Sequence, residues 1–65
     1  MSRPFLAKEV DRYGDCARVR VYRIDGRDDG GFSRRLLADY ETLSRGATAS
    51  ARKEMRKLEK EGALA

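Results

Sequence analysis

The sequence predicts an α+β fold, a small ββαα domain in which an N-terminal β-hairpin precedes a helical hairpin. Three observations predict it: period-two alternation near residues 16–24, helical apolar spacing in 33–46, and a second helical segment in 48–62. The 65 residues allow one domain, because a chain this short buries only about 60% of its unfolded surface. The expected parts are a hairpin (1–24), an acidic Gly-rich loop (25–32) and two helices (33–46 and 48–62).

The predicted hairpin spans about residues 5–24, although apolar and charged residues do not alternate cleanly in residues 5–10, which suit a first strand or a short helix. Its turn is expected in the sequence DRYGD, residues 11 to 15, because Gly14 adopts a positive φ without steric cost. After the turn, Ala17, Val19 and Val21 fall on one face of the second strand. The opposite face receives Cys16, Arg18, Arg20, Tyr22 and Ile24. These side chains are therefore expected to point away from the core.

The predicted loop and first helix follow. The sequence DGRDDGG is too rich in Asp and Gly to continue a strand, and Phe32 is expected to return to the core. Ser33 is a suitable N-cap for a helix from Arg34 to about Arg45, ended by Gly46. Apolar residues in this segment follow helical spacing: Leu36, Leu37, Tyr40 and Leu43.

The predicted second helix contains the sequence ARKEMRKLEKE, with Thr48 or Ser50 as its N-cap. Gly62 is expected to end it, with Ala63 meeting Leu58 in a Schellman-type closure. Its apolar stripe is narrow and consists of Ala51, Met55 and Leu58. Such a stripe packs along one seam, either on the first helix or on another chain, so the sequence predicts homo-oligomers formed through it.

Composition and charge favour an anionic partner. The chain has 15 basic and 11 acidic side chains, a net charge of +4, and both of its ends are basic while residues 25–32 are acidic. Cys16 is alone, so no intramolecular disulfide forms and a reducing compartment is expected. No apolar run is long enough for a secretory signal or a membrane span. A complete, soluble, cytoplasmic product without membrane partners is therefore expected.

Enzymatic chemistry has little support in the sequence. Histidine is absent, and Cys16 has neither an imidazole nor a second thiol to activate it or to share a metal. Asp28 and Asp29 lie in a Gly-bounded loop, where nothing fixes their geometry. The same loop fails as a calcium motif, because Arg27 and Leu36 stand where carboxylates are needed. We therefore expect no catalytic residue, no metal and no cofactor.

Two groups of basic residues are the candidate binding residues. Arg18, Arg20 and Tyr22 line one face of a strand at alternate positions, which suits contact with a DNA groove or with phosphates. The second helix carries the other group: Arg52, Lys53, Arg56, Lys57 and Lys60. Three acidic residues are interspersed among them: Glu54, Glu59 and Glu61. Ordinary solvated charge is the alternative interpretation of both groups.

The order of these elements resembles the ribbon-helix-helix family, in the alternating RVRVY, a helix from Arg34, the turn RGATAS and a second helix. The resemblance spans about residues 17–62. It implies that Arg18, Arg20 and Tyr22 enter the major groove of DNA and that Thr48 and Ser50 hold backbone phosphate. Three features depart from the family pattern: the long link from Ile24 to Ser33, the polar second helix and the additional N-terminal segment.

The sequence therefore predicts a small, non-enzymatic, basic accessory or regulatory protein that binds nucleic acid, most simply DNA, through arginines of the strand and helix. The alternative is an inhibitor or adaptor of the kind that phages and mobile elements encode, which binds a larger protein. Both classes are expected to be tiny and rich in charge.

Overall fold

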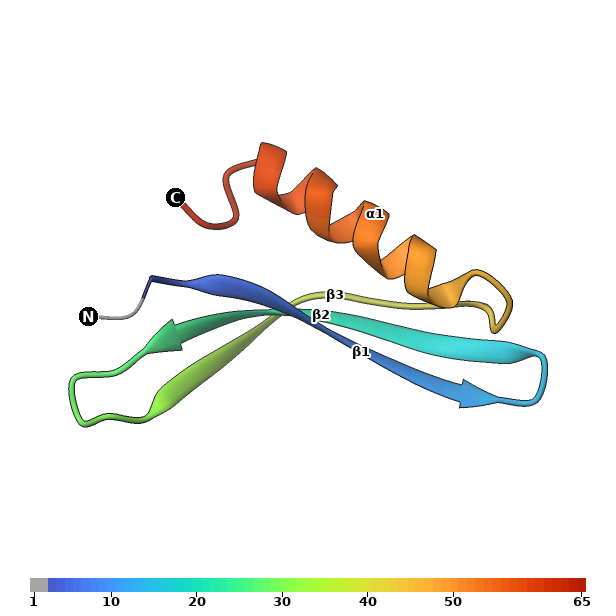
Figure 1. Ribbon diagram of the computed structural model, residues 1–65, viewed down its shortest axis with the longest axis horizontal. Helices are drawn as coiled ribbons and strands as arrows, with labels where there is room; N and C mark the ends of the chain where they lie inside the picture. Colours follow the sequence, from blue (N-terminus) through green and yellow to red (C-terminus); the bar gives the residue numbers. More distant parts are fainter. Residues whose placement is uncertain (1–2) are drawn as a thin grey trace.

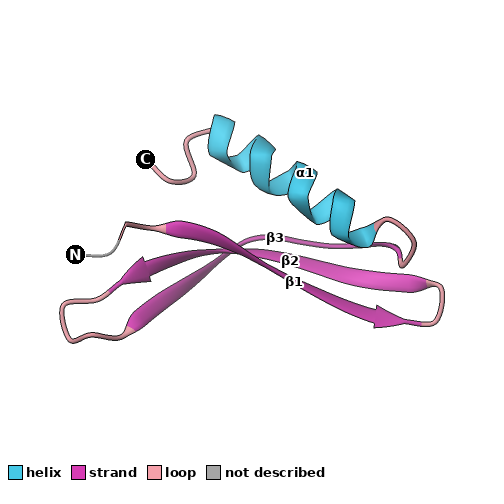
Figure 2. Cartoon of the chain, in the orientation of Figure 1, coloured by secondary structure: helices cyan, strands magenta, loops and turns pink. Residues whose placement is uncertain are grey.

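A three-stranded antiparallel sheet and one C-terminal helix make up the protein (Figure 1). The computed structural model describes residues 3–65. The strands are β1 (Phe5–Tyr13), β2 (Cys16–Gly26) and β3 (Phe32–Leu43), in the order β1-β2-β3, and the helix is α1 (Ala47–Lys60). Figure 2 shows that α1 lies over one side of the twisted sheet, while no helix or strand of residues 3–65 covers the other side. We call the uncovered side the open face.

The predicted β-hairpin is confirmed. β1 and β2 pair from Phe5 with Ile24 to Tyr13 with Cys16, so only Gly14 and Asp15 remain in the turn. Gly14 has a φ of 60°, as the first central residue of a type II′ turn requires. The turn therefore lies at the position that the sequence indicates.

The alternation of β2 is also confirmed. Ala17, Val19 and Val21 are fully buried on the face that α1 covers. Leu6 of β1 and the helix residues Ala47 and Ala51 complete the buried core. Arg18 and Arg20 lie on the open face, because successive side chains of a strand point to opposite sides.

The predicted helix over 33–46 is wrong, because these residues form β3. The fold is α+β, but the ββαα arrangement and the ribbon-helix-helix order do not occur. A β-bulge explains the helical spacing: Val21 pairs with Ala38 and Tyr22 pairs with Leu36, which leaves Leu37 without a partner in the ladder. The extra residue shifts the period-two pattern halfway along the strand.

The predicted acidic loop is a tight hairpin connection between β2 and β3. Only residues 27–31 lie outside the strands, so Asp25 and Gly26 belong to β2. The amide of Arg27 donates to the carbonyl of Gly31 at 2.8 Å, and the amide of Gly30 donates to the carbonyl of Arg27 at 3.1 Å. Gly30 has a φ of 86°, so the connection is a turn followed by a left-handed glycine.

The expectation that Phe32 returns to the core is wrong. Phe32 begins β3 opposite Gly26, and 59% of its surface is exposed. Ser33 caps no helix, because it lies within the same strand.

The second predicted helix is confirmed as α1, with its bounds at Ala47 and Lys60. Its N-cap is Gly46, which has a φ of 83° and no capping side chain, so Thr48 and Ser50 are not the cap. The Schellman closure is confirmed at the other end, where the amide of Ala63 donates to the carbonyl of Leu58 at 2.9 Å.

The narrow apolar stripe of α1 lies against the sheet. Ala51 is fully buried, and Met55 and Leu58 pack against the same core. The seam assigned to homo-oligomers is therefore used within the chain itself. No helix among residues 3–65 has both the length and the apolar composition needed to cross a bilayer.

Candidate functional site

The candidate binding residues divide between two opposite surfaces. Arg18, Arg20 and Tyr22 project from the open face of β2, whereas the basic residues of α1 lie on the other side of the sheet. The structure therefore brings each group together within itself but keeps the two groups apart. One ligand of modest size cannot touch both.

Ion pairs hold Arg18 and Arg20 on the open face. Arg18 donates from Nε to Asp39 Oδ1 at 2.8 Å and from Nη2 to Asp39 Oδ2 at 3.1 Å. Arg20 donates from Nη1 to Glu9 Oε1 at 2.9 Å, and the same atom lies 3.5 Å from Asp11 Oδ2. Arg18 and Arg20 are thus each flanked by carboxylates of the outer strands.

The pKa values of these groups follow from the ion pairs. The hydrogen bond from Arg18 is the main cause that lowers the pKa of Asp39 below its usual 3.8. The hydrogen bonds to Asp39 and Glu9 are the main causes that raise the pKa values of Arg18 and Arg20, respectively. These directions favour the charged forms of Arg18, Arg20 and Asp39 at neutral pH.

The centre of the open face carries more acidic than basic charge. Arg18 and Arg20 lie in two cross-strand rows with four carboxylates: Glu9, Asp11, Asp39 and Glu41. Tyr13 donates a hydrogen bond to Glu41, which is the main cause that raises the pKa of the tyrosine. A phosphate approaching this centre meets carboxylates beside each arginine, so the arrangement does not favour an anion.

Tyr22, the third strand residue, contacts a different cation. The guanidinium carbon of Arg34 lies 4.4 Å from the centroid of the Tyr22 ring, which is cation–π geometry. Arg34 pairs with Ile24 in the ladder, so its side chain also lies on the open face. The ring of Tyr22 is therefore partly covered by a neighbouring side chain.

The exposed large apolar side chains all lie on the open face. They occupy both ends of the face, on either side of the charged centre, and they are Phe5 (49% exposed), Tyr13 (48%), Phe32 (59%), Leu36 (50%) and Leu43 (64%). Scattered apolar residues need no explanation, but concentration on one uncovered sheet face is typical of an interaction surface. The sequence analysis missed these residues, because three of them belong to the strand that it assigned to a helix or to the core.

The basic residues of α1 form one continuous surface. With 3.6 residues per turn, Lys53, Arg56 and Lys60 lie opposite the residues that face the core. Arg52 and Lys57 lie beside them, one on each flank, and all five side chains are exposed. We call this set the basic ridge: Arg52, Lys53, Arg56, Lys57 and Lys60.

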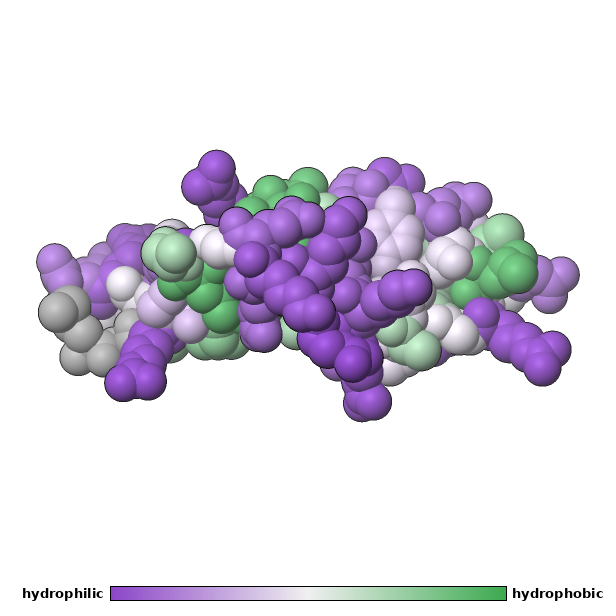
Figure 3. Space-filling model, turned by 90° about the horizontal axis from the view of Figure 1, so that it is seen from above, coloured by the Kyte–Doolittle hydropathy of each residue, from purple (hydrophilic) through white to green (hydrophobic). Residues whose placement is uncertain are grey.

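The acidic residues of the helical segment do not interrupt the basic ridge. The helical period places Glu59 on one margin, and Glu54 and Glu61 on the other, nearer the sheet. Figure 3, which looks onto α1, shows hydrophilic side chains gathered over the middle of the molecule. A helical wheel of the sequence shows this separation of acidic from basic residues, whereas the linear order of the residues does not.

The covered side of the molecule carries the excess of positive charge. α1 and the sheet face beneath it hold nine basic and three acidic side chains, whereas the open face holds three basic and four acidic ones. The basic side chains of the sheet on the covered side are Lys8, Arg12, Arg23 and Arg35. Arg12 donates to Thr48 Oγ1 at 2.9 Å, and Arg23 donates to the carbonyl of Ala63 at 2.7 Å. These two cations tie the sheet to α1 and to the segment after it.

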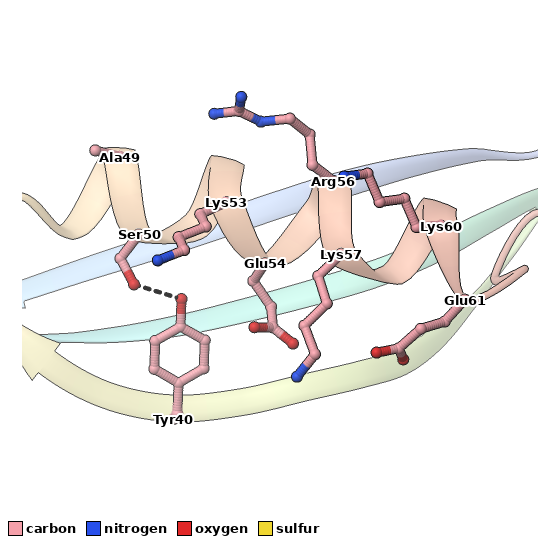
Figure 4. A pocket seen from close by; sticks show the side chains of 9 residues that line it. All are labelled: Tyr40, Ala49, Ser50, Lys53, Glu54, Arg56, Lys57, Lys60 and Glu61. Carbon is pink, nitrogen blue, oxygen red and sulfur yellow. Dashed lines mark hydrogen bonds between the residues drawn. The ribbon is translucent and has the colours of Figure 1, made fainter.

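A shallow groove lies between α1 and β3 (Figure 4). The hydroxyl groups of Tyr40 and Ser50 lie 2.8 Å apart and join its two walls. Figure 4 shows Glu54 and Lys57 extending from the helix towards β3, while Arg56 points away from the sheet. Basic and acidic side chains both line the groove. The side of α1 that faces away from the sheet is therefore the more cationic of the two surfaces.

Residues 3–65 contain no group of three or more His, Cys, Asp or Glu side chains placed to hold a metal ion. Cys16 is a free thiol of intermediate exposure. Comparison of the chain with protein-family models, with curated proteins and with solved structures finds no match in any of the three.

Proposed function

We propose that this protein is a small, non-enzymatic accessory protein that binds duplex DNA through the basic ridge of α1. One observation carries the proposal: five cationic side chains form a continuous exposed surface, with the acidic residues of the segment at its margins. The major groove of DNA admits an α-helix, and phosphates line both of its edges. Lys53 and Lys60 lie about 10 Å apart along the helix axis, which is less than the width of that groove.

The strand arginines are less suited to this contact than the sequence predicts. Arg18 and Arg20 are already paired, and the four carboxylates around them would repel phosphate. The hydrogen bonds to Asp39 and Glu9 occupy part of the donors of these guanidinium groups and place a carboxylate beside each of them. The proposal therefore assigns the nucleic-acid contact to the helix.

Binding to a fluorescent duplex of mixed sequence at several salt concentrations tests this function. We compare wild type with two variants that each lose two positive charges, K53A/R56A and R18A/R20A. Each phosphate contact contributes about 0.9 to the slope of log affinity against log salt. K53A/R56A should therefore reduce the slope by about 1.8. R18A/R20A should leave the slope unchanged.

Three results would contradict the proposal. One is failure of wild type to bind duplex at low salt, and another is a larger loss of affinity in R18A/R20A than in K53A/R56A. Tighter binding to an oligothymidine strand than to the duplex would exclude a helix in the major groove, because a single strand has no such groove. Circular dichroism of each variant verifies that the fold is retained.

A second candidate function is supported by the opposite surface. The five exposed apolar side chains on the open face favour an inhibitor or adaptor that binds a larger protein, of the kind that phages and mobile elements encode. Affinity capture after nuclease treatment distinguishes the candidates. A protein partner of the open face is retained by K53A/R56A and lost by L36E/L43E, whereas a partner recovered only through nucleic acid disappears with nuclease.

A further inference from the structure

One end of the open face is apolar and uncovered. Side chains from all three strands meet there, and we call them the apolar patch: Phe5, Tyr22, Ile24, Phe32 and Leu36. Phe5, Phe32 and Leu36 are each about half exposed or more. We call the residues that lie opposite each other across the strands a row. The patch contains no carboxylate, because the first acidic residues of the face, Glu9 and Asp39, lie in the next row.

Opposite net charges lie on the two sides of the row Ala7, Tyr22 and Leu36, which we call the middle row. The row on one side ends in Arg34. The row on the other side is Glu9, Arg20 and Asp39, and Asp39 lies on the same strand as Arg34. Among the described residues Arg34 forms no ion pair, and its guanidinium rests on the ring of Tyr22. An arrangement with opposite charges on either side of an apolar centre is complementary to itself.

We infer that the apolar patch binds a second copy of this chain, in a two-fold dimer with the two open faces in contact. The two-fold axis lies in the plane between the two sheets and runs along the middle row, perpendicular to the strands. It places Tyr22 and Leu36 of one copy against the same residues of the other. The same operation places Arg34 of each copy opposite Asp39 of the second copy, because both residues are one row from the axis on β3. Packed sheets lie about 10 Å apart, a distance that long side chains such as arginine bridge.

The charged centre of the face excludes a dimer centred elsewhere. If the axis lay between the rows of Arg18 and Arg20, arginine would face arginine and the outer-strand carboxylates would face each other. Desolvating like charges in this way is strongly unfavourable. An axis on the middle row avoids facing like charges, and it sets Phe5 and Ile24 of one copy over the mutually paired Glu9 and Arg20 of the other. The exposed end at Tyr13 and Leu43 then remains outside the interface.

The core of the single chain is small, which adds a reason to associate. Its two largest fully buried side chains are valines, so burial of three aromatic rings and two aliphatic side chains is a substantial addition. Five central side chains make an interface smaller than the standard size of 20–30 residues a side. We therefore expect weak association, with a dissociation constant on the order of 10–100 µM.

Sedimentation equilibrium from 5 µM to 500 µM tests the dimer with two matched pairs of variants. L36E places two carboxylates at the axis, while L43E makes the same change at the other end of the open face. R34E removes the cation opposite Asp39, while R35E makes the same change on the covered face. We expect L36E and R34E to raise the dissociation constant tenfold or more, and L43E and R35E to change it less than threefold.

A dilution series followed by NMR does not depend on whether the variants fold. The amides of 5–9, 20–24 and 32–39 should shift with concentration, while those of 13–16 and 43 should not. The sedimentation and NMR experiments each have one result that supports the dimer and one that contradicts it. A wild type that remains monomeric at 500 µM overturns it. Equal loss of association in L36E and L43E, or concentration-dependent shifts located on α1, also overturns it.

Discussion

Arg18 and Asp39 form a bidentate ion pair diagonally across β2 and β3. In the strand register Arg18 is opposite Glu41 and Asp39 is opposite Arg20, yet the two hydrogen bonds of 2.8 Å and 3.1 Å join Arg18 to Asp39. The pair lies at the centre of the open face, and the side chain of Asp39 is 27% exposed. It joins the middle strand to the strand that contributes no fully buried residue to the core.

Asp39→Asn should make stability less dependent on pH in the acidic range. The pKa of Asp39 is lowered in the folded protein, so its contribution is fully present above its ordinary value of 3.8 and is lost as pH falls through the lower folded value. The variant should melt below wild type at pH 7, and the gap should narrow as pH falls below 3.8. Thermal melts at a fixed protein concentration measure this difference. A gap that persists unchanged at pH 2 would mean that the carboxylate charge is not the cause.

Val21→Ala should lower the free energy of unfolding by about 2 kcal/mol, because it removes two buried methyl groups and leaves a cavity. Val21 is fully buried between β1, β3 and α1. Leu43→Ala is the control, since Leu43 is 64% exposed and its loss should cost about 0.5 kcal/mol or less. Urea denaturation measures both. Equal effects would contradict the assignment of the two faces of the sheet.

Gly46→Ala should cost about 1 kcal/mol, because alanine is strained at the φ of 83° that precedes α1. A Cβ atom at this position meets nothing within 4 Å, so the cost is conformational rather than steric crowding by neighbours. Gly46→Asn should cost less than half as much, since asparagine tolerates the left-handed region and is a favourable N-cap. Urea midpoints compare the two. A neutral alanine variant would argue against a left-handed residue before the helix.

The proposed dimer and the proposed DNA contact together predict that the protein bridges duplexes. With the open faces inside, the two basic ridges point in opposite directions and cannot enter the groove of one straight duplex. Beads carrying one duplex should therefore retain a second, labelled duplex when wild-type protein is added. L36E should still bind the bead-bound duplex but should retain at most one tenth of the label. If L36E bridged duplexes as well as wild type, bridging would not depend on the apolar patch.

Local sequence signals predict much of this fold. The turn at Gly14, the two faces of β2, helix α1 and its closure at Gly62 each depend on residues within about one turn or one hairpin of each other. Such signals are strong because the same few residues determine both the pattern and the conformation. The structure therefore agrees with the sequence at these places.

β3 could not be predicted in the same way, because its bulge imitates a helix. Leu36, Leu37, Tyr40 and Leu43 have the spacing of a helical stripe, yet Leu36 and Leu43 lie on the open face while Tyr40 packs towards α1. The unpaired Leu37 changes which positions share a face. Only pairing with β2, which is tertiary information, selects the strand.

The two candidate surfaces also differ in whether they can be predicted from the sequence. The basic ridge is visible in the sequence once the helical period is applied to residues 52–60. The apolar patch is not, because it requires Phe32 and Leu36 to be in a strand beside Tyr22. The ion pairs of Arg18 and Arg20 likewise depend on carboxylates that the chain brings from β1 and β3.

The bulge at Leu37 also divides β3 into two parts with different anchorage. The part after it is fastened by side chains, through Asp39 to Arg18 and through Tyr40 to Ser50. Among the described residues, no side chain of 32–36 makes a hydrogen bond. Segments with fewer anchoring contacts open locally at a lower free-energy cost. Amide hydrogens of 32–36 should therefore exchange with solvent faster than those of 38–43. Such a difference would make the bulge the boundary between a loosely held tip of the sheet and the part of β3 that pairs with the buried valines.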